Sequence, residues 1–230
     1  ASQGHPPAPS TLYGDGIAIE GSSNNTVRFN TARRNGPYSG IGIYQVSDTD
    51  HVFPSAPAVN NLIEGNQVLD NAAGRLGGTC DNDGIRVEPS VSPGNRIQGN
   101  TVAGNGLDGI SLFSRVSGTY VVGNQVYNNG FFGSASGDGI RVFGFGNFIQ
   151  NNNTNNNRGG GISVARRTGA AIGSLAAPNG RDNQITFNTA TGNVIFDLYD
   201  SNFACDNNTW HGNKWHTANQ ACTTLGGQQI

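Results

Sequence analysis

Apolar and polar positions follow one motif along most of the chain: Asn-x-apolar-x-x-Asn-x-apolar-x-x-Asn. The first copy consists of Asn25, Val27, Asn30, Ala32 and Asn35. Later copies start at Asn61, Asn95, Thr119, Asn147, Asn183 and, less regularly, Asn208. A short apolar segment precedes each copy. The first six segments begin Gly-Ile, at Ile17, Ile41, Ile85, Ile110, Ile140 and Ile162, and the seventh reads Ile195-Phe196-Asp197-Leu198.

This pattern predicts short strands separated by bends. Pairs such as Ile110/Leu112 have period two, which is typical of a strand with one buried face. The apolar-x-x-Asn step breaks that period, so we expect the chain to bend at the Asn, a residue that tolerates left-handed backbone angles. Gly and Asn are poor helix formers, and no 3.6-residue stripe is sustained.

Stacked coils would place equivalent Asn residues about 4.8 Å apart, so that their amides form hydrogen-bonded ladders. We therefore predict an all-β fold, a single-stranded right-handed parallel β-helix (solenoid) of about seven coils with Asn ladders. The Asn residues have a structural role in this interpretation.

The repeat resembles that of the parallel β-helix repeat family, the pectin-lyase-like superfamily, over nearly all of residues 14–215. That resemblance implies a fold shared by polysaccharide lyases, glycoside hydrolases, alginate epimerases, phage tailspikes and non-catalytic surface proteins. Three of the family's catalytic motifs are missing: Asp-Pro-His-Asp, Gly-His-Gly with paired Asp, and Arg-x-Pro-x-x-Arg. No catalytic set is therefore carried over residue by residue.

The domain organisation follows from the extent of the repeat. Residues 1–13, with three prolines, are expected to form an extended lead-in, and we expect further domains upstream of residue 1. Residues 14–222 form the predicted β-helix, and residues 223–230 a frayed tail. Trp210 and Trp215 are expected to cap its C-terminal end.

Cysteine and charge bear on location and partners. Cys205 and Cys222 flank the last aromatic segment and suit a disulfide, the alternative being two reduced buried thiols, and Cys80 is left over. A disulfide favours an extracellular or cell-surface protein. A net charge of −2 with 12% charged residues argues against nucleic acid as a partner. The sequence contains no run of 18 apolar residues, so no membrane-spanning helix is predicted.

Candidate chemistry gathers on the outward positions of the Gly-Ile strands in coils three to five. Asp83, Asp108 and Asp138 precede the strands, and Arg86 and Arg141 share the first outward column. That column is expected to read Ala18, Gly42, Arg86, Ser111, Arg141, Ser163 and Asp197. The next contains Tyr44, Glu88, Phe113 and Phe143, followed by Tyr199 in coil seven.

These residue types suit an acidic sugar polymer. Arg86 and Arg141, two rungs or roughly 10 Å apart, can pair with uronate carboxylates. Asp83, Asp108 and Asp138 would repel one another, and a Ca²⁺ ion would relieve that repulsion. Candidate catalytic residues are Arg141, Arg86, Asp108 and Asp138. In lyases of the family that the repeat resembles, an Arg serves as base and Ca²⁺ neutralises the uronate, a role that Arg141 or Arg86 could take.

The same residues have structural alternatives. Glu88, Phe113, Phe143, Tyr44 and the loop residue His51 are candidate substrate-binding residues. Asp before Gly, including Asp15, is also common turn chemistry in which the carboxylate accepts a backbone N–H. Aromatic columns also stack between coils, exposed Arg–Asp pairs stabilise little, and a loop histidine need have no task.

Two functions remain open. The first is an extracellular lyase or epimerase that binds and processes an acidic (uronate) polysaccharide at coils three to five. The second is a non-catalytic spacer or glycan-binding stalk of a larger surface or secreted protein. The clustered Arg and Asp residues favour the first function, and the missing motifs favour the second.

Overall fold

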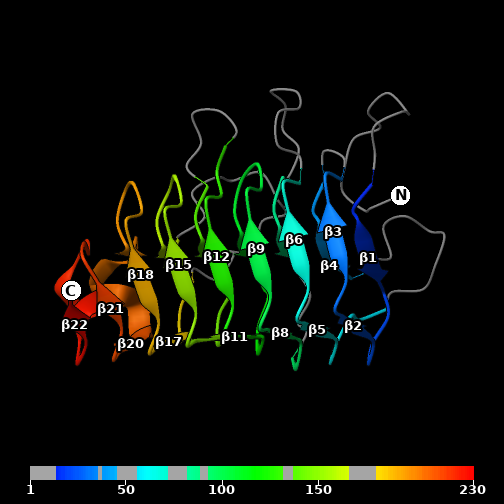
Figure 1. The fold of residues 1–230 in the computed structure, drawn as a ribbon. Coiled ribbons are helices and arrows are strands. Elements are labelled where there is room, and N and C mark those ends of the chain that lie inside the picture. Colours follow the sequence, from blue (N-terminus) through cyan, green and yellow to red (C-terminus); the bar gives the residue numbers. More distant parts are fainter. Residues whose placement is uncertain are drawn as a thin grey trace.

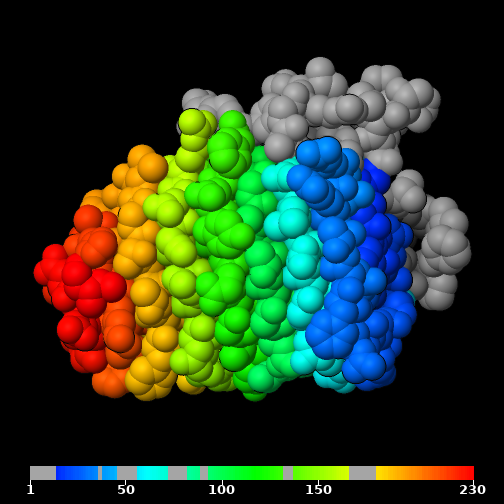
Figure 2. All heavy atoms as spheres, in the orientation of Figure 1, coloured from blue at the N-terminus to red at the C-terminus, as the bar shows by residue number. Residues whose placement is uncertain are grey.

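A computed structural model describes residues 14–35, 38–45, 56–71, 82–88, 93–131, 137–165 and 180–230. His51, Cys80 and the lead-in 1–13 lie outside these residues. The described chain winds into a rod of stacked coils, with the N-terminal coil at the right and the C-terminal coil at the left of Figure 1. In the space-filling view the coils follow one another as bands from blue to red (Figure 2). None of the helices in the described ranges is long and apolar enough to cross a membrane.

Three parallel sheets run along the rod. The first sheet consists of β1 (Ile17–Glu20), β4 (Ile41–Tyr44), β7 (Ile85–Val87), β10 (Ile110–Leu112), β13 (Ile140–Val142), β16 (Ile162–Val164) and β19 (Leu198–Asp200). The second consists of β2 (Thr26–Arg28), β5 (Leu62–Glu64), β8 (Arg96–Gln98), β11 (Tyr120–Val122), β14 (Phe148–Gln150), β17 (Gln184–Thr186) and β20 (Thr209–His211). The third consists of β3 (Thr31–Arg33), β6 (Gln67–Leu69), β9 (Thr101–Ala103), β12 (Gln125–Tyr127), β15 (Asn153–Asn155), β18 (Thr189–Thr191), β21 (Lys214–Trp215) and β22 (Gln228–Gln229). The predicted parallel β-helix of about seven coils is thus confirmed.

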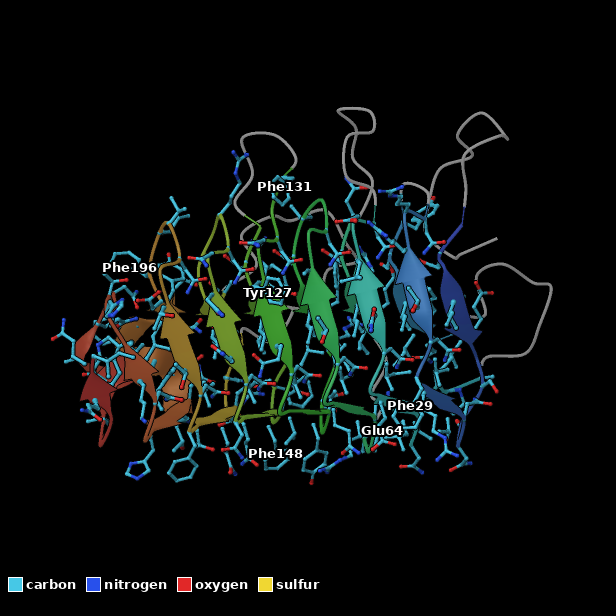
Figure 3. All side chains as sticks on the ribbon, viewed as in Figure 1. Phe29, Glu64, Tyr127, Phe131, Phe148 and Phe196 are labelled. Carbon is cyan, nitrogen blue, oxygen red and sulfur yellow. A yellow bond between two sulfur atoms is a disulfide. The ribbon has the colours of Figure 1, made fainter. Side chains whose placement is uncertain are left out.

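Each coil contributes one strand to each sheet. In the first sheet the two residues that flank the middle of the strand point inward, whereas in the second and third sheets the middle residue does. Ile110, Leu112, Val121 and Val126 of one coil are all 0% exposed, and equivalent residues of neighbouring coils stack on them. In Figure 3, Glu64 and Phe148 project from the lower edge of the rod, which is the outer face of the second sheet. Tyr127 lies on the third sheet, which faces the viewer. The third-sheet strands are in front, so the first sheet forms the far side.

The predicted Asn ladders are present and buried. The backbone N–H and the Nδ2 of Asn66 both donate to Oδ1 of Asn100, at 2.8 and 3.0 Å. Asn66 Nδ2 also donates to the carbonyl of Val27 in the preceding coil, at 2.9 Å. The same pattern links Asn100 to Asn124. Ladder side chains therefore hydrogen-bond the backbone at these bends.

The bends themselves differ from the prediction. The left-handed angles belong to the residue before each ladder Asn, as in Phe29 before Asn30 and Asp70 before Asn71. Asn30 and Asn71 are not among the residues with positive φ. The expectation that the ladder Asn is itself left-handed was wrong, because its side chain must point inward to reach the next coil.

The C-terminal end is closed by the predicted disulfide. Cys205, in the 3₁₀ segment Phe203–Asn207, is bonded to Cys222 in the 3₁₀ segment Ala221–Thr224. Trp210 and Trp215 are buried under this cap, as expected. The tail is not frayed, because β22 pairs in parallel with β21 and extends the third sheet.

The last coil corrects the expected outward column. Ser163 pairs with Tyr199, so Tyr199 and not Asp197 continues the column of Arg86 and Arg141. Asp197 is buried, and its Oδ1 accepts the Nδ2 of Asn193 at 2.8 Å, which ends the third Asn ladder. Leu198 follows Asn193 at the same spacing at which Ile110 follows Asn105, and this spacing determines the register.

Candidate functional site

The outer face of the first sheet brings the predicted Asp and Arg residues together. Strand pairing places Arg86, Ser111 and Arg141 side by side on β7, β10 and β13. An Asp lies three residues before each of them, and Asp15 has the same place before β1. We call Asp15, Asp83, Asp108 and Asp138 the acidic column. The same turn and short strand recur in successive coils, so residues at equivalent positions of neighbouring coils lie side by side.

One oxygen of each carboxylate has a structural role. Oδ1 of Asp83 accepts the backbone N–H of Asp108 at 3.1 Å, and Oδ1 of Asp108 accepts that of Asp138 at 2.8 Å. Oδ1 of Asp138 accepts the N–H of Gly160 at 2.6 Å, and Oδ1 of Asp15 that of Ser39 at 2.8 Å. Each carboxylate thus accepts a backbone N–H, as expected of Asp before Gly, but that N–H belongs to the next coil and not to the turn that contains the Asp. The bond uses one oxygen of each group.

The two arginines have different environments. Arg86 has a side chain that is 5% exposed, and its guanidinium binds Glu88 Oε1 through Nε at 2.9 Å and Nη2 at 2.8 Å. It also lies 3.5 Å from Asp83 and 3.8 Å from the centre of the Phe113 ring. The expectation that Arg86 lies on an open surface was therefore wrong, because Glu88, Asp83 and Phe113 enclose its head group.

Arg141 is the more accessible guanidinium. Its side chain is 29% exposed, with Nη1 3.7 Å from Asp108 Oδ2 and Nε 3.7 Å from Asp138 Oδ2. Both distances exceed a hydrogen bond, and the buried Nε has no hydrogen-bond partner. The Arg141 guanidinium also lies 4.6 Å from the Phe143 ring centre. Arg141 is therefore held in place by charge and an aromatic ring while its side chain stays partly exposed.

The carboxyl groups beside Arg141 are electrostatically perturbed. Burial raises the pKa of Asp108 well above its usual value, the charge of Asp83 adds to this, and Arg141 opposes it. Burial likewise raises the pKa of Asp138, opposed by Arg141 and by the Gly160 N–H. The pKa of Arg141 is raised, because its attraction to Asp108 and Asp138 outweighs the lowering by burial. Such groups exchange protons at a higher pH than an ordinary carboxyl group does.

Of the predicted substrate-binding residues, Phe113 and Phe143 lie beside the arginines, with ring centres 6.0 Å apart and tilted by 55°. Tyr44 is only 3% exposed, and its ring folds over Gly42, where a Cβ would collide with it. Its hydroxyl donates to Asp15 Oδ1 at 3.0 Å, so Tyr44 closes the N-terminal end of the column. His51 lies outside the described residues.

The predicted calcium ion is not supported by the surroundings of the carboxylates. The guanidinium of Arg141 already faces Oδ2 of both Asp108 and Asp138. In the part of the chain that the structure describes, no group of three His, Cys, Asp or Glu side chains could hold a metal ion. These residues fit an arginine better than a calcium ion, so calcium binding stays an untested prediction and no chemical step is assigned to it.

Sequence reasoning placed Ser111 and Ser163 in the column of the arginines but gave their hydroxyl groups no role in the site. Ser111 Oγ lies 3.4 Å from Asp108 Oδ2, and the Ser163 side chain hydrogen-bonds Asp138. Strand pairing confirms that both serines share the column of the arginines. Tyr199 continues this column and stacks on Phe196, with ring centres 5.9 Å apart.

Comparison with known proteins gives matches to the whole fold. A family model described as a right-handed beta helix region matches residues 10–126 and 79–229. A mutant of the periplasmic alginate epimerase AlgG is 14% identical, with a TM-score of 0.56 over 93% of this chain and 41% of that one. The Dettilon tailspike protein is 20% identical, with a TM-score of 0.51 over 77% of this chain and 36% of that one. The chain thus spans about two fifths of each structure, and no curated protein sequence matches it.

Proposed function

Because the chain belongs to the right-handed β-helix family, we propose that it binds an acidic polysaccharide on the outer face of its first sheet and acts on it by proton transfer. Arg141 pairs with the carboxylate of a uronate unit, and Asp108 and Asp138 are the proton-transferring groups. A polysaccharide also agrees with the epimerase and the tailspike, to which the chain is similar in fold.

The observation that carries the proposal is that the Arg141 guanidinium is partly exposed and makes only long contacts with its Asp neighbours. A guanidinium binds a carboxylate through two parallel N–H donors, either Nε with one Nη or the two Nη atoms. The Arg141 side chain is 29% exposed, and its guanidinium contacts its Asp neighbours only at 3.7 Å, which is longer than a hydrogen bond. Arg86 is already engaged by Glu88, so it supports the site and is not the substrate ligand in this proposal.

The chemistry that suits this arrangement is removal of the proton on the carbon next to the uronate carboxylate. Pairing with Arg141 neutralises that carboxylate and makes the proton more acidic. Oδ2 of Asp108 or Asp138 accepts the proton, since a carboxyl group with a raised pKa is a stronger base. Return of a proton to the opposite face gives an epimer. Loss of the neighbouring glycosidic oxygen, which takes up a proton, gives an unsaturated product.

A second function rests on a different observation. Oδ1 of each Asp of the acidic column accepts a backbone N–H of the next coil, which is sufficient reason for an Asp at that position. The chain is then a non-catalytic spacer or a glycan-binding stalk of a larger surface or secreted protein. Binding without turnover is the result that this alternative predicts.

The test is a panel of uronate polymers that contains polymannuronate, polyguluronate, polygalacturonate and polyglucuronate. Binding is measured by calorimetry, elimination by ultraviolet absorbance of the unsaturated product, and epimerisation by proton NMR. We expect one polymer to bind, and Arg141→Ala to weaken that binding at least about tenfold because a charge-assisted pair is lost.

Arg33→Ala is the matched control, because Arg33 pairs with Asp70 on the third sheet, away from the site. Arg141→Lys keeps the positive charge but loses the two parallel N–H donors of the guanidinium, so it should bind more tightly than Arg141→Ala and more weakly than the parent. Product from any polymer supports the catalytic function, and binding without product supports the stalk. If no polymer binds, or if Arg141→Ala and Arg33→Ala bind equally well, the proposed site is wrong.

The proposed location is outside the cytoplasm, extracellular or at the cell surface. The Cys205–Cys222 disulfide supports this, since disulfides persist in oxidising compartments. The periplasmic source of one structural relative agrees with it.

A further inference from the structure

The C-terminal end of the rod contains a cavity that is separate from the acidic column. It lies at the end where the C-terminal residues, red in Figure 2, close the stack. Its volume is about 420 Å³, within the roughly 300–1,000 Å³ typical of small-molecule sites. The polar and aromatic side chains that line it are Trp215, His216, Asn219, Gln220, Thr224 and Gln229.

The lining carries no acid and no Lys or Arg. The lining residues carry three side-chain amides, one hydroxyl, one imidazole and an indole that is 7% exposed. Amide and hydroxyl groups both donate and accept hydrogen bonds. This combination matches the hydroxyl groups of an uncharged sugar. It differs from the site around Arg141, where charged side chains dominate.

Hydrogen bonds to the backbone hold several of these side chains in place. Asn219 Nδ2 donates to the carbonyl of Asp200 at 2.7 Å, and Asn219 Oδ1 accepts the Asp200 N–H at 2.9 Å. Gln220 Nε2 donates to the Asn202 carbonyl at 2.9 Å, and Gln229 Nε2 donates to the His216 carbonyl at 2.8 Å. Fixed amides lose little side-chain entropy when a ligand binds.

The bound amides leave acceptors for a ligand. Gln229 uses only its Nε2 in these bonds, so its Oε1 can accept a hydroxyl proton. The His216 ring is exposed and makes no side-chain hydrogen bond in the described structure. The disulfide holds one wall, because Cys222 lies in the 3₁₀ segment that also supplies Thr224.

We propose that this end cavity binds one unit of an uncharged sugar through His216, Gln229 and the fixed amides of Asn219 and Gln220. The site is independent of the acidic polysaccharide proposed for the first sheet. An extended glycan and a single neutral sugar would then be bound at different places on the rod.

The experiment is an NMR titration of the ¹⁵N-labelled chain with glucose, galactose, N-acetylglucosamine, cellotriose and maltotriose. The chain has two tryptophans, and the indole N–H of Trp210 donates to Asp200 inside the cap at 3.1 Å. The Trp215 indole signal therefore reports on the cavity, and the Trp210 signal is an internal reference. We expect one of these sugars to shift the Trp215 signal saturably, with a Kd in the millimolar range.

Variants on the rim test the assignment without disturbing the core. His216→Ala and Gln229→Ala should each weaken sugar binding several-fold, and His211→Ala should leave it unchanged. His211 is also exposed but stacks edge-on against Phe187 on the second sheet. Absence of a saturable shift with every sugar overturns the proposal. Equal binding by all three variants, or binding of a uronate trimer at the same signal as tightly as the neutral sugars, also overturns it.

Discussion

The Asn ladders inside the rod and the acidic column outside it both repeat once per coil, but they use their polar atoms differently. Ladder Asn124 accepts two hydrogen bonds from Asn100 and donates to Asn152 and to the Ile97 carbonyl. Asp108 Oδ1 accepts the N–H of Asp138, while Asp108 Oδ2 faces Arg141 and Ser111 at longer distances. A residue that repeats once per coil can therefore be structural or functional. What separates the two kinds is whether the side chain keeps a polar atom that is not used in a hydrogen bond within the rod.

The largest expected effect on stability comes from breaking a ladder. Asn124→Ala removes the acceptor of two Asn100 donors and the side-chain donor to the Ile97 carbonyl, whereas Asn152 Oδ1 keeps the backbone N–H of residue 124. Since each unsatisfied buried group costs about 1–3 kcal/mol, we expect a loss of at least about 3 kcal/mol. Chemical denaturation measures this loss. Gln125→Ala, on the exposed side of the same strand, should change stability by less than about 0.5 kcal/mol, and equal effects of the two variants would contradict the ladder account.

The acidic column should respond to pH where the ladders do not. Burial raises the pKa of Asp15 from 3.8 to about 6, although Tyr44 and Ser39 oppose the shift. The folded state then holds its proton longer than the unfolded state, so the stability gained from this group is full below pH 3.8 and is lost as the pH rises to about 6. Asp15→Asn keeps an acceptor for Ser39 and Tyr44 and removes that loss.

We therefore expect Asp15→Asn to be more stable than the parent by about 1–3 kcal/mol at pH 7.5 and equal to it near pH 4. Denaturation at the two pH values tests this. Asp182→Asn, an exposed side chain paired with Arg181, is the control and should show no such difference. A gain that does not depend on pH would contradict the assignment to Asp15.

A gap in one ladder predicts a smaller gain. Thr119 occupies an Asn position, and its Oγ1 is buried without a hydrogen-bond partner. Thr119→Asn should restore the amide link between Asn95 and Asn147 and raise stability by about 1 kcal/mol. Thermal and chemical denaturation measure this gain. A loss of stability would mean that the coil at Thr119 cannot hold an Asn in the ladder geometry.

The last prediction concerns chemistry rather than stability. Asp108→Asn keeps Oδ1 for the N–H of Asp138 and removes a buried carboxyl group whose pKa is raised, so we expect no loss of stability at pH 7.5. Removing one negative charge beside Arg141 should leave uronate binding as tight as in the parent or tighter, while turnover falls at least about a hundredfold. Parallel binding and activity assays test this. Unchanged turnover would exclude Asp108 as a proton-transferring group.

The interior of the rod could be predicted from the sequence because the Asn and Ile columns repeat with fixed spacing. The left-handed residues before each Asn could not, since Phe29, Gly65 and Asp70 have little in common as residue types. Register in the last coil was misjudged because Ile195 is apolar but 48% exposed, whereas Leu198 is buried. The burial of Arg86 and Tyr44 depends on side-chain directions and neighbouring coils, which a linear pattern does not contain.

The most direct test of the account is the ¹⁵Nε–¹Hε NMR signal of Arg141 during titration with an oligomer of the uronate polymer that binds. Arg141 Nε has no hydrogen-bond partner in the free chain, whereas Arg33 Nε donates to Asp70 at 3.1 Å. If Arg141 binds the uronate, we expect a saturable shift of the Arg141 signal, with the same Kd as calorimetry, and no change at Arg33. An unchanged Arg141 signal at saturation would contradict this role of Arg141.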